Sequence, residues 1–366
     1  MKQRLLYFGS DYKVGLTQSL SEQLLELSKE PYVELFCVSS ENEMEPGLHD
    51  NVRKAGINTT IIRHLDEHRQ FLRLASQIDQ VIKSKGVTHV NVHNNWQLAL
   101  VSWLKYRHVI PRRFKIIYTI HGYRHNSPVK AVFAIGIIGL ALLLFADRVI
   151  SMSTYVSRRF WFIGYKTDIV YYMMNKPEFQ KTKNDIVGSP LSMVFPAQFR
   201  HGKRQEVLID AVQQYIRDTG DSSVRLYLPG EGALLDSMKQ RASDAGIAPN
   251  VIFPGKLSHK DVVALYENCN IALVSSNVET YGRCIAEPFV LGRCLITQKT
   301  GVALDIVRDR ENGRFFTDAA SLATILKELH DNPDMVTEMA QKAFVDGKAF
   351  SRDNVMQTYL NSINKA

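Results

Sequence analysis

Short apolar runs alternate with longer amphipathic stretches along almost the whole chain. Runs of four to eight apolar residues have the length of buried strands, and stretches with apolar positions three or four apart predict helices. In the first half, strand signals lie at 4–8, 33–38, 59–62, 87–92, 115–120 and 148–151, with helical stretches such as 18–29 and 69–84 between them. A second series lies at 191–196, 224–228, 251–253, 271–274 and 294–297, with helical stretches at 205–217, 233–245 and 259–268.

This rhythm predicts an α/β protein with two doubly wound, Rossmann-like domains. Alternating strands and helices give parallel sheets with right-handed crossovers. A length of 366 residues suits two domains of about 150–200 residues each. We place the domain boundary around 176–188. Because ligands bind at the carboxyl ends of parallel strands, we expect the two domains to face each other across a cleft.

Composition narrows the class of protein. The chain is 45% hydrophobic and has no low-complexity segment, so it is globular throughout. Its four cysteines form no CxxC pair, which predicts buried free thiols. The first residues lead directly into a strand without a signal-peptide pattern, so we expect a reducing, cytosolic setting. Walker A, Gly-x-Gly-x-x-Gly after the first strand and Asp-x-Asp motifs are missing from the sequence, and we predict neither a cofactor nor a metal site.

Positive charge is concentrated in residues 100–166. This window holds eleven Lys and Arg against the single acid Asp147, a net charge of +10 in a chain of net charge +8. Its centre, 131–146, is sixteen uncharged residues, short of the about twenty that a spanning helix needs. We expect one partly buried helix. It is either a core helix or an apolar surface resting on an anionic membrane leaflet. Nucleic acid ranks below the membrane, because aromatic and basic residues do not interleave.

The segment 275–287 carries the strongest candidate chemistry. Glu279 and Glu287 lie eight positions apart, with Tyr281 and Gly282 between them. A helix beginning near Gly282 would direct backbone N–H donors and its positive dipole end at a diphosphate. Carboxylates accept hydrogen bonds from hydroxyls, which suits one glutamate to a sugar and the other to a ribose. On spacing alone, two surface glutamates that fall at this distance by chance are the better explanation.

The segment resembles the donor-site signature of retaining GT-B glycosyltransferases of family 4, Glu-Gly-Phe-Gly-x4-Glu. In this chain it runs from Glu279 to Glu287, with Thr280 in place of the first glycine. The resemblance covers about 190–315. It extends over Leu291–Thr297, Gly301–Val307 and the Glu311-Asn312-Gly313 turn.

The resemblance also implies that the loop before the helix predicted at 205–217 binds the diphosphate. Lys203 takes the position of the family's diphosphate-binding lysine, whereas Gln198 stands where an arginine is usual. Arg200 or Arg204 could replace that charge from the same loop. The alternative for Lys203 is an ordinary solvated lysine.

In the N-terminal domain the resemblance implies His121 as the histidine beside the donor sugar. His93 and Trp96 are similar to the family's acceptor-side loop, which Arg124 would extend, and Gly15 to its glycine loop at the domain edge. The alternatives are a histidine that caps a loop, and a turn that places Trp96 in the core.

The resemblance implies a retaining, metal-independent transfer of a hexose-type sugar from a UDP-sugar, or a GDP-sugar, to a saccharide acceptor. We predict a lipid-linked acceptor at the inner face of the plasma membrane, as in O-antigen or capsule assembly. The domains would be 1–180 on the acceptor side, 188–350 for the nucleotide-sugar, and 351–366 as a helix crossing back. A sugar-nucleotide epimerase or hydrolase, or a non-catalytic GT-B protein that binds a membrane or a partner, remain alternatives.

Overall fold

The chain divides into two compact units, and each is described by itself. Unit 1 comprises 1–152, 156–173 and 352–366, and unit 2 comprises 153–155 and 174–351. The computed structural model describes 3–8, 22–39, 55–62, 70–107, 114–121, 128–174 and 190–366. The boundary predicted at 176–188 lies outside these residues.

Unit 1 is built on a parallel sheet in which seven strands are described. The strand order is β3-β2-β1-β4-β5-β6-β7, and every strand pair described is parallel. The six predicted strands are confirmed to within two residues at each end, and β7 was not predicted. The strands are β1 (Gln3–Phe8), β2 (Val33–Ser39), β3 (Asn58–Ile61), β4 (His89–Val92), β5 (Lys115–Ile120), β6 (Arg148–Ser151) and β7 (Thr167–Ile169).

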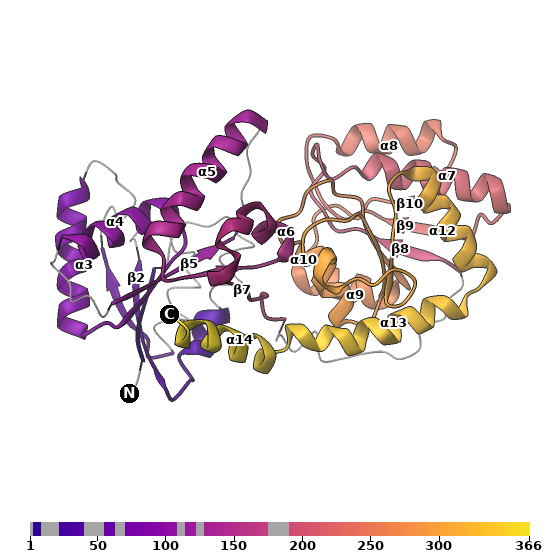
Figure 1. Ribbon diagram of the computed structural model, residues 1–366. Helices are drawn as coiled ribbons and strands as arrows, with labels where there is room; N and C mark the ends of the chain where they lie inside the picture. Colours follow the sequence, from indigo (N-terminus) through magenta and orange to yellow (C-terminus); the bar gives the residue numbers. More distant parts are fainter. Residues whose placement is uncertain are drawn as a thin grey trace. The chain divides into compact units, whose positions relative to one another are not determined.

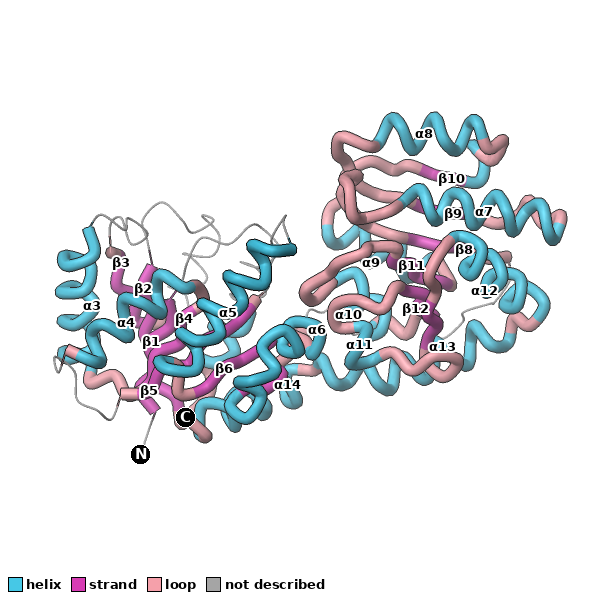
Figure 2. Tube along the Cα trace, turned by 45° about the horizontal axis from the view of Figure 1, so that its top comes forward, coloured by secondary structure: helices cyan, strands magenta, loops and turns pink. Residues whose placement is uncertain are grey.

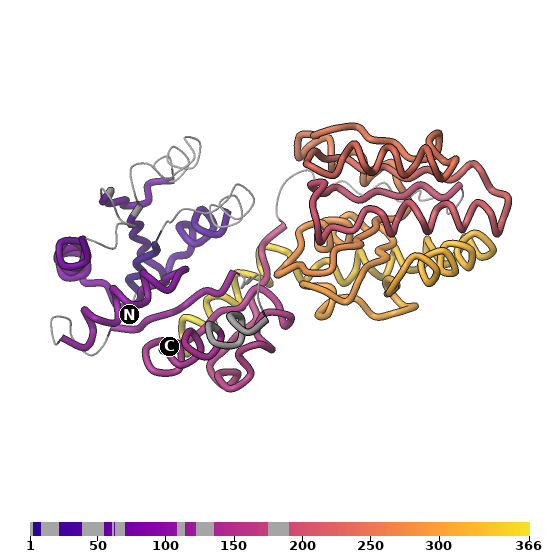
Figure 3. Tube along the Cα trace, turned by 90° about the horizontal axis from the view of Figure 1, so that it is seen from above, coloured from indigo at the N-terminus to yellow at the C-terminus, as the bar shows by residue number. Residues whose placement is uncertain are grey.

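Helices cover this sheet (Figures 1 and 2). The last helix, α14, belongs to unit 1 and lies against β6, as Figures 2 and 3 show. Its Tyr359 hydroxyl accepts a 2.6 Å hydrogen bond from the Asn91 side chain of β4, and Arg352 pairs with Glu26 and Glu30. The helices are α3 (Phe71–Lys85), α4 (Asn95–Tyr106), α5 (Pro128–Phe145), α6 (Thr154–Ser157), the 3₁₀ segment η2 (Arg158–Lys166), α14 (Arg352–Asn364) and a helical stretch at 22–27.

Unit 2 contains a second parallel sheet, of six strands, in the order β10-β9-β8-β11-β12-β13. All four residues of β11 and all four of β12 are buried, as expected for central strands covered on both faces. The five predicted strands are confirmed, and only the edge strand β13 was missed. The strands are β8 (Ser192–Val194), β9 (Arg225–Tyr227), β10 (Val251–Ile252), β11 (Ile271–Val274), β12 (Cys294–Thr297) and β13 (Gly313–Phe315).

The helices of unit 2 include the three predicted ones, α7, α8 and α9. Helices α7 and α12 pack against each other beside β8 (Figure 1). The predicted fold class, two Rossmann-like α/β domains, is therefore confirmed for each unit. The helices are α7 (Gln205–Thr219), α8 (Leu235–Asp244), η4 (Ala248–Asn250), α9 (His259–Asn268), α10 (Arg283–Val290), α11 (Ala303–Ile306), α12 (Ala319–Asp331), α13 (Asp334–Asp346) and η5 (Gly347–Phe350).

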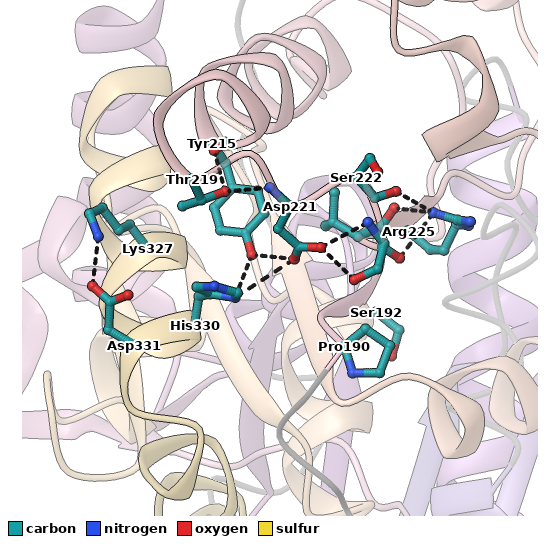
Figure 4. Close-up of polar contacts among 12 residues, drawn as sticks. Pro190, Ser192, Tyr215, Thr219, Asp221, Ser222, Arg225, Lys327, His330 and Asp331 are labelled. Carbon is teal, nitrogen blue, oxygen red and sulfur yellow. Dashed lines mark hydrogen bonds and ion pairs between the residues drawn. The ribbon is translucent and has the colours of Figure 1, made fainter.

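A polar cluster ties α7 to α12 at the end of the sheet where β9 begins (Figure 4). The buried Tyr215 hydroxyl donates to Asp221 at 2.7 Å and lies 3.0 Å from Nδ1 of His330. Asp221 lies in the turn between α7 and β9, so this cluster is at the amino ends of the strands. Ligands of such sheets bind at the opposite edge, and we assign the cluster to helix packing.

Two further predictions can be compared with the structure. None of the four cysteines forms a disulfide, and Cys37, Cys269 and Cys294 are buried, as predicted. The run 131–146 lies in the single helix α5 up to Phe145, and Ala146 directly follows the helix. Of the helices that the structure describes, none has the length and apolar character needed to cross a membrane.

Candidate functional site

Two loops of unit 2 that are far apart in sequence meet at the carboxyl edge of its sheet. Lys203, before α7, forms an ion pair with Glu279, which follows β11. The side chains are only 13% and 14% exposed. The Ser275 hydroxyl donates to the Lys203 carbonyl at 2.7 Å, and the Asn277 amide donates to the Gly202 carbonyl at 2.9 Å. The two segments that the sequence singled out therefore form one structural unit.

A third loop holds Glu279 in place. The Glu279 amide donates to the Thr300 hydroxyl at 2.7 Å, and the Val302 amide donates to the Tyr281 carbonyl at 2.8 Å. Gly301 has φ +54°, and a Cβ there would lie 2.3 Å from the Tyr281 carbonyl oxygen. A glycine is required at this contact, because any side chain would separate the two loops.

Gly282 precedes α10 with φ 87°, and the helix begins at Arg283. The predicted helix start is confirmed, and its first N–H groups lie directly after the Glu279 loop. Tyr281 is buried, and its ring packs edge-on against Phe350 at 6.5 Å. Any contact from Tyr281 to a ligand would therefore come from its backbone.

Glu287 lies in α10 and is only 4% exposed. One carboxylate oxygen, Oε1, lies 3.0 Å from Nε2 of His259 and accepts a 2.9 Å hydrogen bond from Nε of Arg283. Burial alone would raise the pKa of Glu287. The hydrogen bond from His259 and the charge of Arg283 outweigh burial and lower the pKa below its ordinary value. Glu287 is thus a buried carboxylate that stays ionised.

The loop before α7 also holds the arginines considered as replacements at Gln198. Gln198 is exposed. The Arg204 guanidinium already has a partner within the protein, because it donates to the Asn277 side chain at 2.9 Å. Arg200 differs, since its Nε is buried and meets no hydrogen-bond partner within the described parts of the chain. A buried donor of this kind suits an anionic ligand.

In unit 1, His93 and His121 follow the neighbouring strands β4 and β5. Nδ1 of His93 lies 2.8 Å from Nε2 of His121, and Nδ1 of His121 lies 2.8 Å from the Tyr172 hydroxyl. Burial lowers the pKa of His121 to about 3 and, with the neighbouring His121, that of His93 well below its ordinary value. Both imidazoles are therefore neutral, and they can donate and accept hydrogen bonds without carrying charge.

The remaining predicted site residues are placed as follows. Trp96 is half-buried and packs edge-on against Phe71 of α3 with 5.2 Å between ring centroids. The Asn94 side chain caps α4 by accepting from the Gln97 amide at 2.8 Å. Gly15 and Arg124 lie outside the described residues.

Three residues that the sequence did not indicate contact the predicted ones: Tyr172 contacts His121, and His259 and Arg283 contact Glu287. Arg283 is four positions before Glu287 on one helix, so an i,i+4 pairing rule would have found it. His259 and Tyr172 come from elements distant in sequence, and no spacing rule points to them. Burial raises the pKa of the nearby Cys284 to about 12, so this thiol stays protonated.

The arrangement in unit 2 suits a ligand that carries both an anionic group and hydroxyl groups. Unit 2 provides an ion-paired lysine, an arginine whose Nε is buried, a helix N-terminus and a second carboxylate on one edge of its sheet. Within the described ranges, no group of three or more His, Cys, Asp or Glu side chains could hold a metal ion.

Comparison with known proteins shows which family unit 2 is similar to. Residues 176–345 match the family described as Glycosyl transferases group 1. The putative glycosyltransferase EpsD of Bacillus subtilis is 26% identical over 167 residues, 45% of this chain and 43% of that protein. The O-antigen chain mannosyltransferase C of Escherichia coli is 24% identical over 176 residues, 46% of this chain and 45% of that protein. The chain thus spans less than half the length of these curated relatives.

Among solved structures, Anabaena HepE in complex with UDP is similar over 100% of both chains, with a TM-score of 0.79 and 18% identity. At this identity the likeness establishes the fold. Residues 176–345 are therefore similar to the glycosyl transferases group 1 family, and the chain has the GT-B fold.

Proposed function

We propose that this protein transfers a hexose-type sugar from a nucleoside-diphosphate sugar to a saccharide acceptor, with retention at the anomeric carbon. The observation that carries the proposal is the joining of Lys203 and Glu279 in one ion pair directly before the helix that Gly282 begins. A cation and the start of a helix thus lie beside a carboxylate, which suits a diphosphate and the sugar attached to it.

The residues divide by the part of the donor that each would contact. Lys203 and Arg200 would hold the diphosphate, Glu287 the ribose, and Glu279 the transferred sugar. When the acceptor hydroxyl attacks the anomeric carbon, the bond to the diphosphate breaks and a diphosphate oxygen accepts the hydroxyl proton. Negative charge grows on the leaving group, and Lys203 and Arg200 would stabilise it without a metal ion.

For unit 1 we propose that the neutral pair of His121 and His93 contacts the donor sugar and the acceptor. A neutral imidazole suits uncharged hydroxyl groups, because it can donate to one and accept from another. The donor we favour is a UDP-sugar. HepE, of the same fold, has been solved with UDP and with UDP-glucose.

We further propose a lipid-linked saccharide acceptor at the inner face of the plasma membrane, in surface polysaccharide assembly. The support is the excess of basic residues around α5 and the similarity to an O-antigen mannosyltransferase.

The experiment is thermal stabilisation of the protein by UDP-, GDP- and ADP-sugars, each at concentrations up to a hundred times its dissociation constant. Such an excess of ligand stabilises the folded state by about 2.7 kcal/mol, a shift of several degrees. We expect stabilisation by UDP-sugars and by free UDP. A protein that no sugar nucleotide or nucleoside diphosphate stabilises would contradict the proposal.

Analysis of the products formed in the absence of an acceptor distinguishes a transferase from an epimerase or a hydrolase. The epimerase or hydrolase alternative predicts stoichiometric release of nucleoside diphosphate or formation of an epimer, whereas a transferase shows neither at a comparable rate until a saccharide is added.

A further inference from the structure

Helix α5 of unit 1 is apolar on both of its faces, and only one of them is buried. Leu142 is 0% exposed, and Gly139 is buried. Ile137, Leu140 and Leu144 are 69%, 54% and 56% exposed. Each set repeats at intervals of three or four residues, so the sets lie on opposite faces of the helix. A helix packed only into its own core would carry polar residues on the outer face.

The adjoining segment η2 enlarges this apolar surface. Its Phe162 ring packs on Gly139 of α5, where a Cβ would lie 2.2 Å from the ring. The Lys166 ammonium donates to the carbonyls of Leu143 and Ala146 at 2.9 and 2.7 Å, which fixes η2 to the end of α5. On the segment held in this way, Trp161 and Tyr165 are 78% and 73% exposed.

Tyr106 adds a third exposed aromatic residue where α4 meets α5. It is 55% exposed, its ring lies 5.5 Å from that of Phe145, and its hydroxyl donates to the Leu144 carbonyl at 3.2 Å. Soluble surfaces rarely gather large apolar side chains in this way unless they bind something.

The structure also revises the electrostatic part of the picture. Several cations of the window 100–166 are paired within unit 1: Lys105 with Asp147 at 2.7 Å, Arg148 with Asp168, and Lys166 with the carbonyls of α5. Arg107 and Arg158 are exposed. The only acidic residue between 128 and 166 is Asp147, the partner of Lys105. The surface therefore has a positive edge, but fewer available charges than the count of +10 indicates.

We propose that this α5–η2 surface, made of Ile137, Leu140, Leu144, Trp161 and Tyr165, docks into an anionic lipid bilayer at the boundary of headgroups and acyl chains. Aliphatic side chains on an interfacial helix enter that boundary, and the amphipathic rings of Trp and Tyr settle at headgroup level. Exposed Arg107 and Arg158 then meet anionic headgroups. The inference deepens the membrane location proposed above and needs no assumption about the donor sugar.

This surface predicts a different salt response from a purely electrostatic attachment. Exposed charges are screened over about 8–10 Å at physiological ionic strength, so a charge-only attachment is lost in salt. Burial of apolar surface is not screened. Part of the binding should therefore persist at about 0.5 M salt, where the Debye length is shorter still.

The test is co-sedimentation of the full chain with vesicles of phosphatidylcholine alone or with phosphatidylglycerol, at low and high salt. The altered protein carries Leu140→Ser, Leu144→Ser and Trp161→Ala. The matched control carries Leu72→Ser and Tyr32→Ala, at residues of unit 1 that are 67% and 76% exposed. We expect the triple variant to lose about tenfold or more in partitioning, including the salt-resistant part, and the control to bind as the wild type does.

A second measurement follows Trp161 itself. Its fluorescence should shift to the blue when vesicles are added and should be quenched by brominated acyl chains, and Trp161→Phe should remove both signals while vesicle binding continues. Binding that the triple variant leaves unchanged would overturn the proposal, as would wild-type binding that salt abolishes completely.

A dimer in solution that the triple variant dissociates, without vesicle binding by the wild type, would also overturn the proposal and assign the surface to a second copy of the chain. UDP binding by calorimetry, measured in parallel, tests the proposed transferase function separately. A variant that binds UDP but not vesicles shows that the two sites are independent.

Discussion

At the carboxyl edges of the two sheets, desolvated polar side chains have opposite charge states: charged in unit 2 and neutral in unit 1. In unit 2, Glu287 is buried and remains charged, because His259 and Arg283 donate to it. In unit 1, desolvation lowers the pKa values of His93 and His121, whose rings contact each other and the Tyr172 hydroxyl, and both become neutral. The same desolvation acts in both places, and the charge of the neighbours decides the outcome.

The difference indicates which part of a nucleotide-sugar each edge suits. A diphosphate needs cations and N–H donors, and in unit 2 these lie near Lys203. A sugar ring offers only hydroxyl groups, and a neutral pair of imidazoles can bond to these without the cost of burying a charge. The division of labour that we propose between the units rests on this contrast.

The largest expected effect comes from removing the cation of unit 2. Lys203→Ala should lower kcat by about 10²–10³-fold, because the leaving diphosphate gains charge in the transition state, and should also weaken UDP binding. The measurements are steady-state kinetics and calorimetry with UDP. Unchanged kinetics in a folded variant would remove Lys203 from the site.

Controls separate charge from position. Lys239→Ala changes a lysine of α8 that is 52% exposed and 3.9 Å from Asp236, and it should have no effect. Arg200→Ala should weaken UDP binding more than Arg204→Ala does, since the Arg204 guanidinium is already bonded to Asn277. The reverse order would show that Arg204 is the cation that compensates for Gln198.

The second prediction distinguishes the two glutamates. Glu287→Gln keeps the shape of the side chain but loses its charge, and should weaken binding of free UDP by about tenfold or more, as expected for a hydrogen bond to a charged group. Glu279→Gln should leave UDP affinity within about threefold of the wild type and lower turnover, because Glu279 is assigned to the sugar. Calorimetry and kinetics on both variants measure this.

If Glu287→Gln binds UDP as tightly as the wild type does, the assignment to the ribose is wrong. His259→Ala sharpens the result. This variant removes one donor to the Glu287 carboxylate, and it should lower UDP affinity less than Glu287→Gln does, because Arg283 continues to hold the carboxylate.

Much of the fold could be predicted because its strands are buried on both faces. The run 271–274 is apolar at every position and coincides with β11, and 115–120 coincides with β5. Strands β7, with the sequence Thr-Asp-Ile, and β13, with the sequence Gly-Arg-Phe, were missed because each has a single large apolar residue and so forms no apolar run. The even shorter edge strand β10 was found because it lies in the apolar run 251–253.

The sequence indicated the candidate residues that fall in motifs of the resembled family, but not the contacts between distant elements. Glu279, Gly282 and Glu287 are close in sequence, so the resemblance found them together. The contact of His93 with His121 depends on β4 and β5 being neighbours in the sheet, which spacing along the chain does not state. The pairing of His259 with Glu287 depends in the same way on how α9 and α10 pack.

The last prediction concerns the pH dependence of unit 1 and has the smallest effect. The pKa of His121 is about 3 in the folded protein, against about 6.5 in an unfolded chain. Above pH 6.5 the residue is neutral in both the folded and the unfolded state, so it does not lower the stability of unit 1. As the pH falls from 6.5 toward 3, the unfolded state takes up a proton first, and stability decreases by about 1.4 kcal/mol per pH unit for each such histidine.

All three tryptophans, Trp96, Trp103 and Trp161, lie in unit 1, so their fluorescence follows unfolding of this unit alone. Denaturant titrations between pH 4 and 7.5 should show the decrease in the wild type and a shallower one in His121→Asn. The matched variant His259→Asn, in unit 2, should leave the tryptophan signal unchanged at every pH. If His121→Asn follows the wild-type curve, then His121 is protonated in the folded state, and the contrast between a charged and a neutral sheet edge fails.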